Sequence, residues 1–250
     1  MSVLVLTYHE IGSGSGPLAV DPGLFREQLD RIVASGVPVL TVSELAGALR
    51  QDRLPQRGVA LTFDDGAASV AVEAAPLLLE RGLRATVFCV AGHLGGWNDW
   101  PSQPARFARF KLASAEALAE LAQLGFEIGS HGLEHAPLPG IPAAHARREV
   151  VESRERIEQA VGAPVRSFAY PYGLAGAEAL VRETYSAACT TALTTVQAGA
   201  DPYALPRVDV HYLRRKVVFA RALDGSAGRY LQVRAFGARA RRSLRRDHAA

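Results

Sequence analysis

Two adjacent carboxylates, Asp64 and Asp65, are the residues whose types and spacing most directly suggest chemistry. They follow the apolar run Gly58–Phe63 and precede Gly66, so both belong to a turn at the end of a predicted strand. Adjacent carboxylates repel each other and lower stability unless a cation lies beside them. An Asx turn with a permissive glycine would explain one of the two aspartates but not both. The pair therefore indicates a cation site.

Two histidines, His131 and His135, supply the nitrogen ligands that such a site needs. They are four positions apart, and on a helical turn this spacing places both imidazoles on one side. The pattern HxxxH is common by chance and is weak alone. Together with a strand-end aspartate it forms a set of two histidines and one carboxylate. Three protein ligands leave room for water, which is typical of a catalytic metal site.

Strands and helices alternate along the chain that must position these residues. Strands are predicted over Val3–Thr7, Val37–Leu40, Gly58–Phe63, Ala85–Val90, Phe126–Gly129, Val165–Tyr170 and Ala187–Thr191, and helices over Asp21–Ser35, Val42–Leu49, Ala68–Arg81, Ser114–Leu124, Ala143–Val161 and Ala175–Tyr185. Such alternation predicts βα units and a parallel sheet. About seven units without a break favour one α/β barrel, which we place over residues 1–225, followed by a basic helix or tail over 226–250.

The candidate polar residues lie where a parallel barrel carries its chemistry. His9, Asp64, Asp65, His131 and Tyr172 all stand just past the end of a predicted strand. The carboxyl ends of the strands share one face of a barrel, and active sites form on that face. A single such residue more often caps a turn or makes a structural hydrogen bond. Five at one mouth favour an active site.

The composition excludes several other classes of protein. Hydrophobic residues make up 48% of 250, which allows a large core, and no apolar run approaches the roughly 20 residues of a membrane span. The N-terminus has no basic segment before its short apolar run, so we expect a cytoplasmic protein without a signal peptide. Cys89 and Cys189 lie in apolar runs without a CxxC partner, so neither a cysteine metal site nor a disulfide is expected.

The net charge of +3 is modest, and we expect no nucleic-acid partner. The basic excess is concentrated near the C-terminus, at Arg239, Arg241, Arg242, Arg245 and Arg246. A tail of this kind is most often solvated. Contact with an anionic surface or an anionic substrate is the alternative interpretation.

Three motifs, taken together, resemble one known family. Residues 62–66 read TFDDG, residues 130–135 read SHGLEH, which matches [ST]HxxxH, and residues 170–173 read YPYG. In this order and at these separations the chain resembles the polysaccharide deacetylase family with the NodB-homology domain, over roughly residues 1–210. Residues 8–11, YHEI, look like the start of its poly-N-acetylglucosamine deacetylase branch.

The resemblance implies a fold, a reaction and a cofactor. The fold is a distorted (β/α) barrel of the NodB-homology type. The reaction is hydrolysis of the N-acetyl group of an amino sugar, or less often of an O-acetyl group of a polysaccharide. Carried over to this chain, Asp64 is the general base, and Asp65, His131 and His135 hold the metal. Zinc is the default ion, while cobalt or nickel can serve in relatives.

The resemblance also implies further site residues. The backbone N–H of Tyr172 would help to hold the oxyanion, and His9, Pro171 and Tyr172 would line the site of an N-acetylated carbohydrate substrate. On general grounds, the metal would polarise the acetyl carbonyl, Asp64 would accept a proton, and the leaving amine would require a proton donor.

The chain departs from the family pattern in two places. Ala169 stands where many members have an arginine that positions the catalytic aspartate. We expect Arg207 to take this role, because Arg166 stands at the start of its strand and therefore at the opposite end of the barrel. The late Leu-x-His motif that carries the general acid is absent. His211 is near in sequence and His9 is on the right face, and the sequence does not choose between them.

Two other functions remain open at this point. A barrel that has kept its sugar groove but lost turnover would explain the missing arginine and the missing late histidine, although retention of the base and all three ligands argues against it. A metal-dependent amidase acting on a small non-sugar amide would use the same groups.

Overall fold

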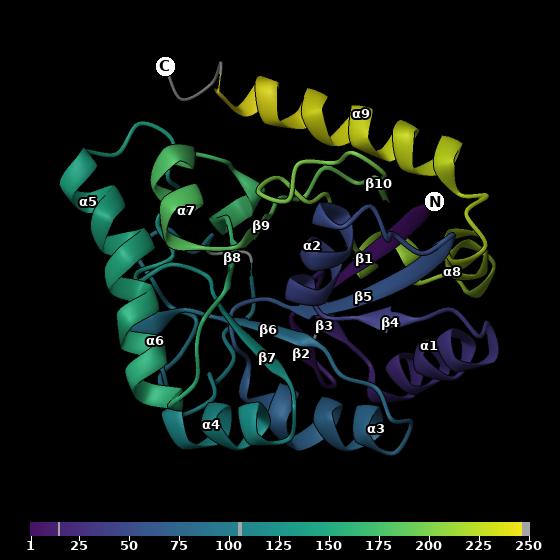
Figure 1. The fold of residues 1–250 in the computed structure, drawn as a ribbon, viewed down its shortest axis with the longest axis horizontal. Coiled ribbons are helices and arrows are strands. Elements are labelled where there is room, and N and C mark those ends of the chain that lie inside the picture. The colour runs from purple at the N-terminus through teal and green to yellow at the C-terminus, as the bar shows by residue number, and fades with distance from the viewer. Residues whose placement is uncertain (15, 105–106, 247–250) are drawn as a thin grey trace.

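A curved, mainly parallel sheet forms the centre of the molecule (Figure 1). The structure, a computed structural model, describes residues 1–14, 16–104 and 107–246, with side chains as far as residue 237. The strand order of the sheet is β10-β1-β5-β6-β7-β8-β9, and β4 pairs with β5 while β11 pairs with β1. Among the described residues of this sheet, β10 is the one strand that runs antiparallel to its neighbour. The strands are β1 (Ser2–Tyr8), β4 (Val39–Leu40), β5 (Arg57–Phe63), β6 (Thr86–Cys89), β7 (Glu127–Ser130), β8 (Ser167–Ala169), β9 (Ala187–Cys189), β10 (Val196–Gln197) and β11 (Val208–Asp209). A separate pair, β2 (Glu10–Ile11) and β3 (Ala19–Val20), follows β1.

The segment from Leu205 to Asp209 brings the two edges of the sheet together. Leu205 pairs with Cys189 of β9, and β11 pairs with β1. The sheet therefore curls into the distorted α/β barrel that the sequence predicts. The carboxyl ends of its parallel strands open on one face, as in other parallel barrels.

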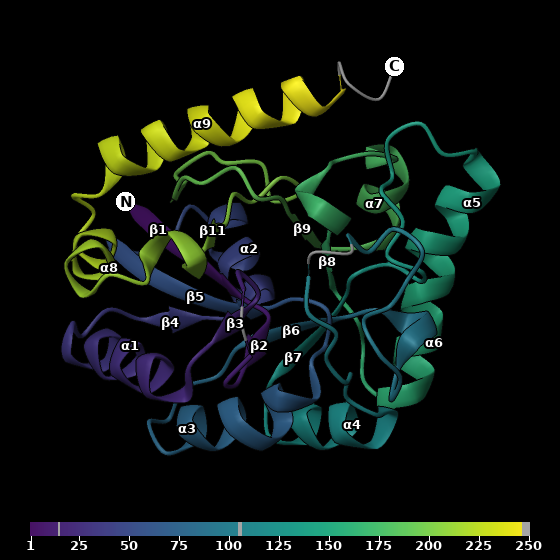
Figure 2. The same ribbon diagram turned by 180° about the vertical axis from the view of Figure 1, so that it is seen from behind.

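Most of the helices cover the outside of the sheet, and α9 runs along the top of both views (Figures 1 and 2). The helices are α1 (Pro22–Ala34), α2 (Val42–Arg50), α3 (Ala75–Leu79), α4 (Ala115–Gln123), α5 (Ala143–Arg147), α6 (Ser153–Val161), α7 (Glu178–Thr184), α8 (Lys216–Leu223) and α9 (Gly228–Arg246). The expected basic C-terminal segment is thus helical as far as Arg246, and residues 247–250 lie outside the described residues. Among the described residues, no helix combines the length and apolar character that crossing a membrane requires.

The strands bury side chains on both faces, as their continuous apolar runs predict. Leu4 and Leu6 of β1 face the larger core beneath the outer helices, whereas Val3 and Val5 belong to a smaller core inside the barrel. Helix α2 contributes to this inner core, and its start is fixed by a capping box between Thr41 and Glu44. The inner core fills the barrel below the mouth and supports the residues that line it.

Two helices predicted as continuous are interrupted by π-helical turns. The turn Val70–Ala74 precedes α3, and Pro76 there has no N–H to donate to the preceding turn. The turn Arg148–Glu152 separates α5 from α6, and the Ser153 hydroxyl donates to the Glu149 carbonyl oxygen at 2.6 Å. Both interruptions lie in helices that follow loops of the barrel mouth.

Candidate metal centre

Asp65, His131 and His135 converge at the mouth of the barrel. The Asp65 Oδ1 atom lies 3.6 Å from the Nε2 atom of each histidine, and the two Nε2 atoms are 3.3 Å apart. Tetrahedral coordination at bond lengths of about 2.0–2.1 Å places ligand atoms about 3.3–3.4 Å from one another. All three side chains are buried. The donor set and its spacing therefore fit a divalent ion such as zinc.

The two histidines lie on a loop, and the prediction of a helical turn from their four-residue spacing is wrong. Strand β7 ends at Ser130, and residues 131–135 are not helical. The backbone passes through left-handed conformations at Gly132 (φ +90°) and His135 (φ +56°). A left-handed residue breaks the helical periodicity, so the shared side of the two imidazoles is a property of this loop.

Each imidazole is held by a different contact. The Nδ1–H of His131 donates to the carbonyl oxygen of Ala169 at 2.7 Å, which leaves Nε2 as the ligand atom. The ring of His135 stacks on Trp100 with centroids 4.4 Å apart and meets the Tyr172 ring edge-on at 4.6 Å. Burial is the main cause that lowers the pKa of His135 well below its usual range, and the nearby His131 lowers it further. His135 is therefore neutral at physiological pH, the form that binds metals.

Asp64 forms a buried, two-pronged ion pair with Arg207. Nη1 and Nη2 of Arg207 donate to Oδ1 and Oδ2 of Asp64 at 2.6 and 2.7 Å, and both side chains are buried. The guanidinium also donates to the Thr190 carbonyl oxygen and the Thr62 hydroxyl. Burial would raise the pKa of Asp64, but the charge and hydrogen bonds of Arg207, with the neighbouring His131, lower it to about 2. The contact is the one predicted from the sequence in place of an arginine at Ala169.

Asp65 follows Asp64 in a tight turn that directs the two carboxylates differently. It adopts φ +68°, and a Cβ atom at Gly66 would lie 2.8 Å from the Cβ atom of Cys89. Burial raises the pKa of Asp65, and the histidines His9 and His131 oppose this effect. Arg207 pairs with Asp64 and not with Asp65, so a metal ion would compensate the buried negative charge of Asp65.

The other expected site residues differ in burial and in their contacts. Pro171 is buried, and Tyr172 adopts φ +59° with its hydroxyl donating to Ser102. His9 is half-buried after β1 and acts electrostatically on both aspartates. His211 is exposed on a short 3-10 turn, where its N–H donates to the Asp209 carboxylate, and no contact joins it to the metal ligands among the described side chains. Arg166, the weaker arginine candidate, is exposed just before β8.

Two side chains that the sequence did not single out, Trp100 and Ser102, support the site from one loop. Trp100 is buried and stacks on His135, while Ser102 accepts from the Tyr172 hydroxyl at 2.9 Å and donates to the His135 carbonyl oxygen at 2.9 Å. A tryptophan in the glycine-rich stretch 92–104 was the available signal. Nothing in the sequence connects that loop to a histidine more than thirty positions away.

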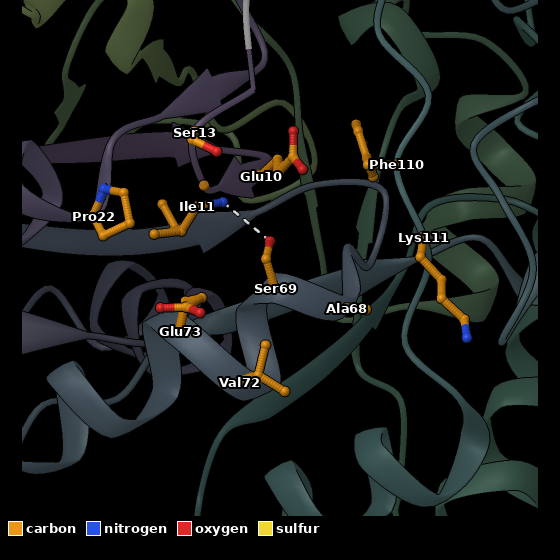
Figure 3. Close-up of a pocket in the computed structure, with 11 residues that line it drawn as sticks. Glu10, Ile11, Ser13, Pro22, Ala68, Ser69, Val72, Glu73, Phe110 and Lys111 are labelled. Carbon is orange, nitrogen blue, oxygen red and sulfur yellow. Dashed lines mark hydrogen bonds between the residues drawn. The ribbon is translucent and has the colours of Figure 1, made fainter.

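A pocket of about 410 Å³ is lined by residues 10–13, which follow β1, and by residues of the segment 68–73, which follows β5 (Figure 3). Its walls include Glu10 and Ile11, directly after His9, and Ala68 and Ser69, shortly after the two aspartates. The Ile11 N–H donates to the Ser69 hydroxyl at 3.1 Å and ties the two walls together. Phe110 also lines the pocket, so its walls carry both polar and apolar groups.

Comparisons with known proteins agree with this geometry. The sequence model of the family described as polysaccharide deacetylase matches residues 51–190. The Bacillus subtilis protein YxkH is 28% identical over 210 residues, which cover 82% of this chain and 70% of that protein. The poly-beta-1,6-N-acetyl-D-glucosamine N-deacetylase of Staphylococcus epidermidis is 26% identical, covering 83% of this chain and 78% of that enzyme. The structure of IcaB from Ammonifex degensii superposes with a TM-score of 0.74 at 26% identity, covering 90% of this chain and 97% of that one.

Proposed function

Because this chain belongs to the polysaccharide deacetylase family, we propose that it hydrolyses the acetamide of N-acetylated amino sugars within a polysaccharide, using a divalent metal ion. The observation that carries the proposal is that the two adjacent carboxylates have different partners. Asp64 is paired with Arg207, whereas Oδ1 of Asp65 lies 3.6 Å from the Nε2 atoms of His131 and His135, a distance typical of two ligands of one metal ion. A binding module would not need an ionised base held beside a metal site.

The ligands proposed for the ion are Asp65, His131 and His135, and zinc is the metal that we expect. Such an ion would supply Lewis acidity, which polarises the amide carbonyl and lowers the pKa of a water molecule. Cobalt and nickel are alternatives with the same donor preferences.

Asp64 is the proposed general base. Its pKa of about 2 means that the carboxylate is ionised at neutral pH, and the two hydrogen bonds from Arg207 fix its orientation. In this role it accepts a proton from the attacking water. Arg207 is the proposed positioning residue, since it holds the base without reaching the substrate.

The oxyanion and the leaving amine require two further groups. We assign the backbone N–H of Tyr172 to the oxyanion, because the left-handed backbone at this residue is a strained conformation of the kind found at functional sites. We assign the proton donor for the amine to His9, which acts electrostatically on both aspartates, in preference to the exposed His211. Pro171, which is buried directly before Tyr172, would line the path of the sugar chain.

The substrate to test first is poly-β-1,6-N-acetylglucosamine, because the Staphylococcus epidermidis relative is named for that activity. Purified protein with added zinc should release acetate from β-1,6-linked oligomers faster than from β-1,4-linked chito-oligosaccharides. Oligomer binding without acetate release would support a binding module instead. Release of acetate only from small non-sugar amides would support the amidase alternative.

We assign the catalytic unit to residues 1–225. The basic helix α9 lies outside that unit, and its arginines are the candidate contact for an anionic surface or substrate.

A further inference from the structure

Glu149 is a completely buried carboxylate that belongs to neither the ligand set nor the base. It lies in the π-helical turn Arg148–Glu152. The adjacent Arg148 pairs with Glu152 and so does not neutralise it. A carboxylate without solvent or a strong cation is costly to bury unless several hydrogen bonds satisfy it.

The donors to Glu149 are backbone N–H groups of the loop that carries the two histidines. Oε2 accepts from Leu133 at 3.0 Å, from Glu134 at 3.2 Å and from Ala136 at 3.3 Å, while Oε1 accepts from Glu134 at 3.0 Å. His145, one turn earlier on the helix, has its Nε2 atom 3.7 Å from Oε1. The carboxylate therefore binds the chain both before and after His135.

The loop is shaped around this carboxylate. Gly132 has φ +90°, and a Cβ atom there would lie 2.6 Å from Oε2 of Glu149. Successive N–H groups that point at one spot form an anion-binding concavity, and here a side chain of the same protein fills it. The left-handed backbone of His135 is held between two of these hydrogen bonds.

The π-helical turn fixes Glu149 relative to the end of β7. The Ser153 hydroxyl bonds to the Glu149 carbonyl oxygen at 2.6 Å, and the Ser130 and Ser153 hydroxyl oxygens are 2.9 Å apart. Ser130 directly precedes His131. Single π turns inside α-helices occur frequently at functional sites, where they redirect a side chain.

We propose that Glu149 is a positioning residue that sets the loop 131–136 in the metal-binding geometry before the ion arrives. It acts through the backbone, and its contacts hold the Nε2 atoms of His131 and His135 3.3 Å apart. This role rests on the proposed metal-dependent function.

The substitution Glu149→Gln tests the proposal. It replaces one acceptor oxygen by an NH₂ group, which cannot accept hydrogen bonds from the backbone N–H groups of the loop. Zinc affinity, measured by competition with a chromogenic chelator, should fall about 10- to 100-fold, the usual effect of losing a group that orients a metal ligand. Hydrogen exchange at the amides of Leu133, Glu134 and Ala136 should accelerate in the metal-free protein. Acetate release should be low at limiting zinc and recover with excess zinc.

Glu127→Gln is the matched control. The Glu127 carboxylate accepts hydrogen bonds from Ser43, Thr86 and Ser167, at the opposite ends of the strands. This variant should lower the unfolding temperature and keep wild-type zinc affinity. Wild-type zinc affinity in Glu149→Gln, or an equal loss in Glu127→Gln, would overturn the proposal.

Three further outcomes are informative. If Glu149→Gln does not fold, Glu149→Asp keeps the charge at a shorter reach and should weaken zinc binding by a smaller factor, and unchanged affinity would again overturn the role. A wild-type protein that binds zinc but releases no acetate would contradict the proposed function and leave the positioning role testable by affinity. A wild-type protein that binds no zinc would overturn both.

Discussion

Replacing Arg207 by methionine should leave the Asp64 carboxylate buried without a partner. The change removes two charged hydrogen bonds of 2.6 and 2.7 Å from a pair with almost no exposed surface. Removing one member of a buried ion pair costs about 3–5 kcal/mol in the free energy of unfolding. At 2–4 °C per kcal/mol for a chain of this size, the unfolding temperature should fall by roughly 6–20 °C.

Arg207→Lys separates orientation from charge. An ammonium group keeps the positive charge but cannot make two parallel bonds to one carboxylate. A base displaced by about 1 Å loses roughly 100-fold in rate, so kcat should fall by about this factor. Zinc stoichiometry should be unchanged, because Arg207 contacts none of the three proposed ligands among the described residues. Acetate release and chelator-detected zinc, measured on the same sample, provide the comparison.

Arg166→Met is the control, since Arg166 is the exposed arginine that the sequence offered as the alternative. It should change neither stability nor kcat appreciably. Arg207 does not position the base if Arg207→Lys turns over at the wild-type rate, or if Arg166→Met loses as much activity.

Three further predictions concern the remaining groups. Asp64→Asn should keep the metal and lose activity, whereas Asp65→Asn should weaken metal binding itself, and metal analysis showing the reverse would exchange their roles. His131→Ala should remove stoichiometric zinc and nearly all activity, and a chelator should do the same to the wild type until zinc is restored; near-normal turnover in either case would exclude the site. His9→Ala should lower kcat by about 10²–10⁴-fold, the usual range for a general acid, while His211→Ala should not; equal effects in the acetate assay would leave the proton donor unassigned.

The sequence predicts most of the fold because the relevant signals are local. Capping residues, stop glycines and continuous apolar strands marked the βα units within a few residues of their observed bounds. The helix start at Asp21 and the capping box at Thr41 are examples. The role of Arg207 is also predicted, because the family resemblance implies an arginine that orients the base and Ala169 cannot supply it.

The remaining features depend on contacts between distant segments. Glu149 stands among several charged residues in REVVESRER, and only the folded chain reveals its burial and its hydrogen bonds to the distant loop 133–136. Trp100 belongs to a loop without periodicity. The loop between the histidines looked helical because four-residue spacing fits a helix, but the left-handed Gly132 overrides that preference.

The ion pair between Asp64 and Arg207 spans 143 positions and has a consequence for the order of folding. During synthesis, both aspartates leave the ribosome well before the segment Leu205–Asp209 that closes the sheet. Contacts of such long range form late, after the entropy of a large loop has been lost. A nascent chain or fragment ending before residue 205 therefore has an open sheet edge and a base without its counter-ion. Barrel closure also brings Arg207 to Asp64, so deacetylase activity would report that this closure has taken place.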